Sequence, residues 1–305
     1  NNVFAFNKHY DPSKPNLLLN SHHDTVRPNK AYTRDPHNAG IIDGKLFGLG
    51  SNDAGGALAS LLGLFVHFYA AENLTYNLIV AATAEEESSG PNGLNSLLKD
   101  LPDIDVAIVG EPTQMQLAIA EKGLVVFDAV VKGTAGHAAH PNNDNPILKS
   151  MDVMQWFQNL QFDKVSDTLG PVKLTITQIN AGSQHNVVPS QVNLVLDVRV
   201  NECYTNQEIA DIVSQAPCEV TPRSLRLQSS SIDKEHPLVV AGVAMGRNTY
   251  GSPTLSDQAA LTCSSLKLGP GDSTRSHTAD EFIYTDEIKE AVRLYIELLN
   301  QVITS

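Results

Sequence analysis

The chain has 305 residues, of which 42% are hydrophobic and 18% are charged, as in folded globular proteins. This length allows two domains, or one large domain that carries an insertion. The formal net charge of -13 argues against nucleic acid or an anionic membrane as the main partner, and no apolar run reaches transmembrane length.

A buried strand is predicted at residues 16–20, after a first strand at residues 3–6, because three leucines follow one another without alternation. His22 and Asp24 come directly after it, and ligands of open α/β sheets bind beyond the carboxyl ends of the strands. In extended chain the two side chains point to the same side, so His22 could bind a metal ion while Asp24 orients its imidazole. A plain hydrogen-bonded His-Asp pair in a turn is the alternative.

A hairpin is predicted around Asp43-Gly44, and the glycine-rich stretch GLGSNDAGG follows it. Within this stretch Asp53 precedes a helix predicted at residues 57–71. Asp53 either caps this helix or bridges two cations with its two carboxylate oxygens. The stretch lacks the GxGxxG spacing and the GK[ST] ending of phosphate-binding loops, which argues against a nucleotide-binding protein.

Two further predicted strands end in acidic residues. The strand at residues 76–82 is followed by Glu85, Glu86 and Glu87, and the strand at residues 104–109 by Glu111. Adjacent like charges repel unless they are solvated or bound to a cation, so the three glutamates form either a solvated loop or part of a metal site. Because strands repeatedly end in His, Asp or Glu, we predict an α/β sheet with a zinc site of imidazole and carboxylate ligands at one edge.

The pattern changes at Lys122, after which strands alternate as half-exposed strands do. The order β-α-β-β-α-β predicts a ferredoxin-like inserted domain at residues 122–230, between the two parts of a first domain at residues 1–121 and 231–305. We expect three side chains of its first helix, Met151, Met154 and Trp156, to face the core. The predicted elements are strands at 124–133, 172–179, 192–200 and 218–227 and helices at 147–160 and 206–215.

The last region contains a predicted helix at residues 238–248, a short strand at 263–267 and a terminal amphipathic helix at 286–302. Between the last two lies His277, in GPGDSTRSHTADEF. It completes the set of candidate ligands.

Seven motifs in order carry a family resemblance: SHHDTV, GLGSNDAGG, TAEEESSGPNG, GEPT, GHAAHP, NVVP and PGDSTRSHTADEF. Together they resemble the di-zinc family of aminoacylases, deacetylases and carboxypeptidases, which includes acetylornithine deacetylase and succinyl-diaminopimelate desuccinylase. The resemblance spans nearly the whole chain. It implies a zinc-peptidase-like α/β/α catalytic domain with an inserted dimerisation, or lid, domain.

The resemblance also implies two zinc ions, for which Co2+ or Mn2+ could substitute. Asp24 would orient the first ligand. Carried over position by position, the ligands are His22 and Glu111 on one ion, Glu87 and His277 on the other, and Asp53 bridging both.

The general base implied by the resemblance is Glu86, the first of the family's paired glutamates. This sequence departs from the family here, because Glu85 stands where the family has Asp. A slip of one residue would make Glu85 the base and Glu86 the ligand in place of Glu87. We prefer the first register because it leaves residues 88–90 in the family's positions.

In the inserted domain, the resemblance implies that His137 of GHAAHP stabilises the oxyanion, in its own site or that of a partner subunit. His140 is the second candidate. Asn186 and Arg199 resemble residues that contact the substrate carboxylate, although Arg199 could equally form a salt bridge on the strand surface. The inserted domain would form a homodimer.

The implied reaction is zinc-dependent hydrolysis of an N-acyl amino acid, a small molecule. The motifs are most similar to the acetylornithine deacetylase branch of arginine biosynthesis, with N-acetylcitrulline or N-succinylornithine as further substrates. Succinyl-diaminopimelate desuccinylase or a metallo-dipeptidase or carboxypeptidase is the alternative. A non-catalytic relative would lack the base or a ligand, and here every candidate is present.

Three widely spaced cysteines suit a reducing compartment, so we expect a cytoplasmic protein. The chain begins at Asn1 within a predicted strand, and we expect further residues before it.

Overall fold

The computed structural model describes residues 1–304 and divides the chain into two compact units. Unit 1 contains residues 1–120 and the chain from residue 230 onward, and unit 2 is Glu121–Ser229. The predicted boundaries, 122–230, differ by one residue at each end. Within the described part of the chain, no helix has the length and apolar character needed to span a membrane.

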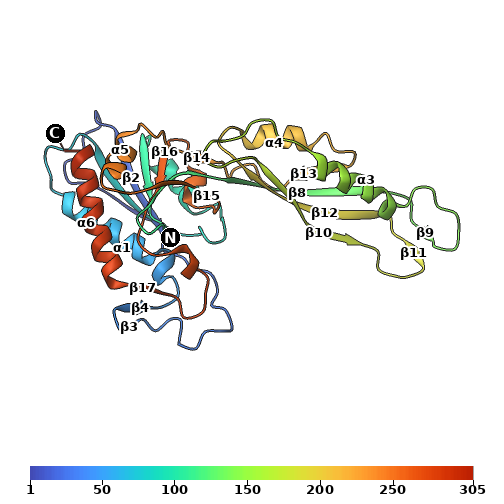
Figure 1. The fold of residues 1–305 in the computed structure, drawn as a ribbon, viewed down its shortest axis with the longest axis horizontal. Helices are drawn as coiled ribbons and strands as arrows, with labels where there is room; N and C mark the ends of the chain where they lie inside the picture. Colours follow the sequence, from blue (N-terminus) through green and yellow to red (C-terminus); the bar gives the residue numbers. More distant parts are fainter. Residues whose placement is uncertain (305) are drawn as a thin grey trace. The chain divides into compact units, whose positions relative to one another are not determined.

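The main sheet of unit 1 is mixed, with a parallel centre (Figure 1). Its strands are β1 (Val3–Phe6), β2 (Asn16–His22), β5 (Asn77–Thr83), β6 (Val106–Val109), β7 (Leu117–Glu121), β14 (Ser230–Ser231), β15 (Thr249–Ser252) and β16 (Ser264–Lys267). The order is β1-β5-β2-β6-β16-β7-β14, and β15 pairs with β7. Strands β5, β2, β6 and β16 run parallel, whereas β1 and β7 pair antiparallel with them.

Both faces of β2 are covered, which explains its unbroken apolar run. Leu17 and Leu19 belong to a core cluster with residues of α1 (Gly56–Phe68), α5 (Pro237–Ala244) and α6 (Thr285–Val302). Leu18 points to the other face and packs with residues of α2 (Leu94–Leu97). Helices α1 and α6 lie side by side (Figure 1).

The carboxyl ends of the parallel strands meet at one edge of the sheet, as predicted. Short turns complete this part of the chain: η1 (Ser51–Gly55) before α1, η2 (Leu98–Asp100), η3 (Asp257–Ala260) and η4 (Ser273–Arg275). A three-stranded sheet lies beside them, formed by β3 (Gly40–Ile42), β4 (Lys45–Phe47) and β17 (Phe282–Tyr284). The predicted hairpin turn is present, since Asp43 and Gly44 have φ values of 50° and 78°.

Unit 2 is a four-stranded antiparallel sheet with two helices, in the predicted order β-α-β-β-α-β. Its strand order is β10-β12-β8-β13. Strand β13 is shorter than the predicted 218–227, because Leu225 and Leu227 instead accept hydrogen bonds from the Asn206 side chain of α4. The elements are β8 (Gly123–Lys132), β9 (Gly136–His137), α3 (Pro146–Asn159), β10 (Lys173–Ala181), β11 (Val187–Val188), β12 (Gln191–Val200), α4 (Asn206–Val213) and β13 (Glu219–Pro222).

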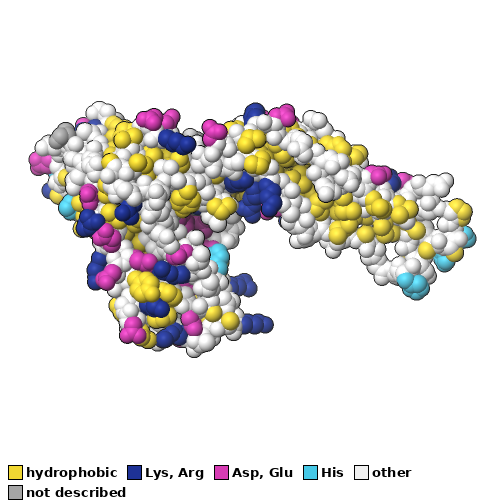
Figure 2. Space-filling model, viewed as in Figure 1, with side chains coloured by type: hydrophobic (Ala, Val, Ile, Leu, Met, Phe, Trp, Pro, Cys, Tyr) yellow, Lys and Arg dark blue, Asp and Glu magenta, His cyan; other side chains and the backbone are white. Residues whose placement is uncertain are grey.

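The expectation for Met151 is wrong. Helix α3 turns Ser150, Val153 and Phe157 inward at helical spacing, which leaves Met151 63% exposed. Met154 and Trp156 pack partly buried against the core of this unit. Figure 2 shows hydrophobic side chains gathered on unit 2, in the region where Figure 1 draws α3 and β12.

Candidate metal centre

His22, at the end of β2, is the buried end of a cluster of titratable side chains. Its imidazole is 1% exposed, and its Nε2 lies 3.1 Å from Asp53 Oδ1 and 3.7 Å from Glu111 Oε1. Glu86 Oε2 lies 3.9 Å from the same nitrogen. Nδ1 donates a hydrogen bond to the backbone carbonyl of Asp24 at 3.0 Å, which fixes the orientation of the ring. Nε2 then remains as the nitrogen that can coordinate a metal ion.

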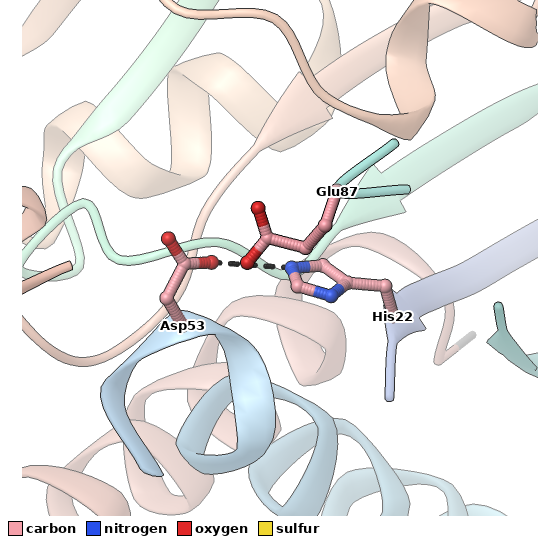
Figure 3. Close-up of side chains that lie close together, drawn as sticks. All are labelled: His22, Asp53 and Glu87. Atoms are coloured by element: carbon pink, nitrogen blue, oxygen red, sulfur yellow. Dashed lines mark hydrogen bonds and ion pairs between the residues drawn. The ribbon is translucent and has the colours of Figure 1, made fainter. Parts of the chain in front are cut away.

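His277 is the exposed end of the cluster, with 53% of its side chain accessible. Its Nε2 lies 3.0 Å from Glu87 Oε2 and 3.6 Å from Asp53 Oδ2. Asp53 therefore turns one oxygen toward His22 and the other toward His277. Figure 3 shows His22, Asp53 and Glu87 converging from the end of β2, the turn before α1 and the loop after β5.

The donor set fits metal ions. Two groups of three side chains have ligand atoms close enough to hold an ion: His22 with Asp53 and Glu87, and His22 with Glu86 and Glu111. Imidazole and carboxylate donors suit zinc and related divalent ions. The three cysteines are free, and none belongs to such a group among the residues described.

The pKa shifts of the clustered side chains also indicate a site for metal ions. Burial raises the pKa of Glu86 to about 8 and raises the pKa values of Glu87 and Glu111, with neighbouring carboxylates adding to the effect. Burial disfavours charged His22, but the Asp24 and Asp53 carboxylates, which accept hydrogen bonds from its ring, raise its pKa far above the usual value. Carboxylates crowded in this way are costly unless cations compensate their charge, so bound cations would relieve the site.

Asp24 lies between His22 and the loop that carries Glu86 and Glu87. Its carboxylate lies 3.5 Å from His22 Nδ1, farther than its own backbone carbonyl, so the predicted orientation of His22 comes mainly from the main chain. The carboxylate instead accepts the backbone N–H groups of Glu86 and Glu87, each at 3.2 Å. It thereby holds the loop that carries both glutamates.

Glu85 turns away from the cluster. Its carboxylate accepts hydrogen bonds from the backbone N–H and the side-chain amide of Asn92, at 2.9 and 3.0 Å. Glu86 and Glu87 are the members of the run that reach the other candidate ligands. Glu85 therefore lies outside the cluster, and the roles of Glu86 as base and Glu87 as ligand stay predictions.

The predicted residues of the inserted domain lie in unit 2. His137 and Asn186 are neighbours there, because β9 pairs with β11 and the backbone N–H of Ala138 donates to the carbonyl of Asn186 at 3.0 Å. Both side chains are exposed, and the His140 ring lies 5.6 Å from that of His137. Arg199 forms a bidentate pair with Asp197, at 2.8 and 3.1 Å, as the alternative expected. Their roles toward substrate stay predictions.

Sequence reasoning missed Glu281, a buried carboxylate behind Asp53. It accepts the backbone N–H groups of Gly50, Asn52 and Asp53 at 3.2, 2.9 and 3.0 Å. The side chain of Asn52 in turn donates to the carbonyl of Asp272, which fixes the loop that carries His277. An Asp-Glu pair in a polar loop gave no signal of this role, because the three amides lie far away in sequence.

A cavity of about 390 Å³ opens onto the cluster within unit 1. Besides the candidate ligands, its wall contains Lys267 at the end of β16, with Ser252 and Thr254 from the β15 strand and loop. Sequence reasoning missed these residues too.

A parallel-centred α/β sheet with a carboxylate and imidazole cluster beyond its strand ends is typical of metal-dependent hydrolases. Residues 18–301 match the model of Peptidase family M20/M25/M40, and the chain belongs to this family. The family match agrees with the predicted enzyme class, a metal-dependent amidohydrolase.

Curated relatives carry one recurrent name. Succinyl-diaminopimelate desuccinylase 2 of Ruegeria sp. (strain TM1040) is 30% identical over 210 residues, which cover 65% of this chain and 53% of the relative. Succinyl-diaminopimelate desuccinylase of Acidiphilium cryptum (strain JF-5) is 25% identical over 312 residues, 94% of this chain and 83% of the relative. The chain thus spans about half the length of the first relative. Both relatives carry the name of the stated alternative and not that of the predicted acetylornithine deacetylase.

Solved structures share the fold. Aminopeptidase PepT from Bacillus cereus ATCC 10987 superposes with a TM-score of 0.75 at 16% identity, covering 99% of this chain and 84% of that one. The Bacillus subtilis YXEP protein, described as a dinuclear metal-binding peptidase of the M20 family, gives a TM-score of 0.68 at 16% identity, covering 98% and 84%. The predicted fold class is confirmed.

Proposed function

We propose that this protein hydrolyses the amide bond of an N-acyl amino acid, with an N-succinyl amino acid such as succinyl-diaminopimelate as the preferred substrate class. Family membership supports the reaction type, and the names of the curated relatives support the acyl group. The observation that carries the proposal is the two-sided position of Asp53, between His22 and His277.

The proposed cofactor is a pair of zinc ions, for which Co2+ or Mn2+ could substitute. His22 and Glu111 would hold one ion and Glu87 and His277 the other, with Asp53 between them. Two observations support this assignment. The ligand atoms lie close together around Asp53, and every candidate ligand is a carboxylate or an imidazole. Zinc bound there would polarise an amide carbonyl and make a water molecule acidic enough to ionise near neutral pH.

Side chains of this protein would transfer the proton of the attacking water during hydrolysis. Glu86 would take a proton from the attacking water and deliver it to the leaving amine. Its carboxylate is held at the cluster through the backbone N–H that donates to Asp24. A carboxyl whose pKa burial raises to about 8 can both accept and return a proton near neutrality. His137, with His140 as the second candidate, would stabilise the oxyanion, and Asn186 and Arg199 would contact the substrate carboxylate.

We also propose that unit 2 forms a homodimer. Strand β10 is an edge of its sheet, and most of its residues are exposed. Apolar side chains remain exposed on this unit: Ile147, Leu148, Met151, Ile179 and Val187. An open edge and exposed apolar side chains favour association with a second copy. Sedimentation velocity should find a dimer, and a monomer at micromolar concentration would contradict it.

Acetylornithine deacetylation in arginine biosynthesis is the second candidate, supported by the SHHDTVRP motif of the sequence. The free cysteines support a reducing compartment, the cytoplasm, for either reaction.

Two measurements test the proposal together: the zinc content of the purified protein and amine release from four compounds. These compounds are N-succinyl-diaminopimelate, N-succinylornithine, N-acetylornithine and N-acetylcitrulline. We expect about two zinc ions per chain and turnover of the succinyl compounds. A preference for the acetyl compounds would move the assignment to the second candidate. If no compound is hydrolysed after zinc or cobalt is added, the proposal that this protein is an amidohydrolase is wrong.

A further inference from the structure

Arg275 lies two residues before His277, in the loop that carries this candidate ligand. Its guanidinium forms a bidentate ion pair with Glu287 of α6, in which Nη1 donates to Oε2 at 2.7 Å and Nη2 donates to Oε1 at 3.1 Å. Both side chains are largely buried, with 20% and 29% of their surfaces exposed. Because two parallel hydrogen bonds hold a planar guanidinium in one orientation, this ion pair connects the loop firmly to α6.

Two aromatic rings of β17 lie against the same guanidinium. Arg275 Cζ lies 5.0 Å from the ring centroid of Phe282 and 5.2 Å from that of Tyr284. The backbone N–H of Tyr284 donates to Glu287 Oε2 at 3.0 Å, so the carboxylate that binds the guanidinium also binds the strand. Arginine is attracted to aromatic faces by cation–π interaction, which adds to the ion pair. Arg275 therefore connects its loop to β17 as well as to α6.

The backbone around His277 needs support from outside the loop. His277 and Asp280 have left-handed φ values of 61° and 54°, which residues other than glycine seldom adopt unless the surrounding structure imposes them. The imidazole itself is 53% exposed. The hydroxyl of Thr278 donates to the backbone carbonyl of Arg275 at 2.7 Å, which closes a turn around the histidine. The position of the imidazole therefore depends on the contacts that hold this turn.

Other contacts hold the loop at different points. The side-chain amide of Asn52 donates to the carbonyl of Asp272 and to Ser276 Oγ, at 3.0 and 3.2 Å. The carboxylate of Asp280 accepts a backbone N–H of the loop after β2 at 2.9 Å. These bonds connect the loop to the turn before α1 and to the loop after β2, whereas Arg275 connects it to α6 and β17. Loss of Arg275 should therefore loosen the loop without detaching it.

We propose that Arg275 is a positioning residue that keeps His277 in place to bind the metal ion of the exposed half of the site. That half is formed by Glu87, His277 and Asp53. The inference rests on the proposed function and deepens it, because it names a residue on which retention of the outer ion depends. Without Arg275, the imidazole would occupy more positions and the outer ion would dissociate faster. The ion beside His22 should be little affected, because the covered strand β2 holds that histidine.

The first test measures zinc retention. Wild-type protein and the Arg275→Gln variant are loaded with zinc, and transfer of the zinc to a chelating indicator is followed with time. We expect the faster phase, assigned to the exposed half, to accelerate about 10-fold or more, as is typical when a residue that orients a metal ligand is removed. The slower phase should keep its rate. Arg275→Lys keeps the charge but loses the bidentate geometry, so it should give an intermediate rate. Equal rates in the wild type and both variants would overturn the inference.

Helix α6 provides a matched control. Arg293 forms a similar bidentate pair with Glu290, at 2.9 and 2.6 Å, but both residues belong to the same helix. Arg293→Gln should therefore leave both phases of zinc release unchanged. Glu287→Gln weakens the ion pair from the other side and serves if Arg275→Gln does not fold. The double variant of Arg275 and Glu287 should release zinc no faster than Arg275→Gln alone, because the two residues act through one contact.

Activity gives a second readout, which separates positioning from a direct part in the reaction. Arg275→Gln should lose kcat when zinc is limiting and recover most of it when zinc is in excess, because the remaining ligands can still bind the ion. Failure of excess zinc to restore kcat would contradict the inference, since the loss would not come from a missing ion.

A purely structural role of Arg275 predicts different results. If Arg275→Gln lowers the melting temperature of the metal-free protein while both rates of zinc release stay those of the wild type, the ion pair supports only the fold and the inference is wrong. A rise in both rates together, or one phase shared by both ions, would also overturn it, since the two halves would not be held separately.

Failure of the proposed function gives a distinct result. If the wild-type protein binds no second zinc ion, the proposed pair of ions is wrong and the inference falls with it. If it binds about two zinc ions but hydrolyses none of the N-acyl compounds, the proposed reaction is wrong. The rates of zinc release then still decide whether Arg275 positions His277.

Discussion

His22 and His277 stand on opposite sides of Asp53, and the fold holds them in different ways. His22 ends a strand whose two faces are both covered, and its side chain is buried. His277 lies in a loop, has a left-handed φ of 61° and is half exposed. The first position is fixed by the core of unit 1, whereas the second depends on polar contacts among loops. One site therefore combines a rigid half with an adjustable half.

The largest effect is expected at the buried half. Glu86→Gln should reduce kcat by about 10²- to 10⁴-fold, because the base that moves the proton is lost. Zinc content should stay near that of the wild type, as measured by elemental analysis. Glu85→Gln is the matched control, since Glu85 bonds to Asn92 outside the cluster. Loss of zinc in the Glu86 variant, or a larger loss of activity in the Glu85 variant, would reverse the register.

The two histidines should differ in how much metal each retains. His22 is the buried ligand and lies 3.1 Å from Asp53, which would bridge both ions, so His22→Ala should leave less than about one zinc ion per chain. His277→Ala should retain about one, because only the exposed half loses a ligand. Elemental analysis after gel filtration measures both. Equal metal loss in the two variants would show that the halves are not distinct.

Release of metal to a chelator should occur in two phases. The half that contains His277 is open to solvent, so we expect its ion to leave first and the ion beside His22 to leave more slowly. Zinc released into a colorimetric indicator follows both steps. Release of both ions in a single phase would contradict the proposed difference between the buried and the exposed half of the site.

A smaller effect is expected from the support behind Asp53. Glu281→Gln removes a carboxylate that accepts three backbone N–H groups, and an amide oxygen cannot satisfy them all. We expect a loss of about 1–3 kcal/mol in the free energy of unfolding and faster chelation at the exposed half. Glu290→Gln, on the exposed face of α6, is the control. A wild-type release rate in the Glu281 variant would argue against support from this carboxylate.

The sequence was sufficient for the parts that local pattern controls. The apolar strands, the hairpin at Asp43-Gly44 and the polar residues after strands β2, β5 and β6 follow from periodicity and turn chemistry. Parallel strands place their carboxyl ends at one edge, so His22, Glu86 and Glu111 could be expected to meet.

Contacts between loops distant in sequence could not be read in the same way. The bonds from Gly50, Asn52 and Asp53 to Glu281 join residues more than two hundred positions apart, and no periodicity marks them. The exposure of Met151 depended on the rotation of α3, which a helical spacing alone leaves open. The ion pair of Arg199 was predicted only as one of two alternatives, because a strand surface offers charged partners at every second position.

The central position of β2 has a consequence for the protein without its metal. Strand β2 pairs with β5 and β6 on its two sides, and all seven of its residues are buried. Its amide hydrogens should exchange with solvent only when the whole unit unfolds, whereas those of the loop around His277 exchange through local opening. The apo chain would then keep half of its coordination geometry in place, and metal uptake would begin on a preformed template and finish by ordering a loop.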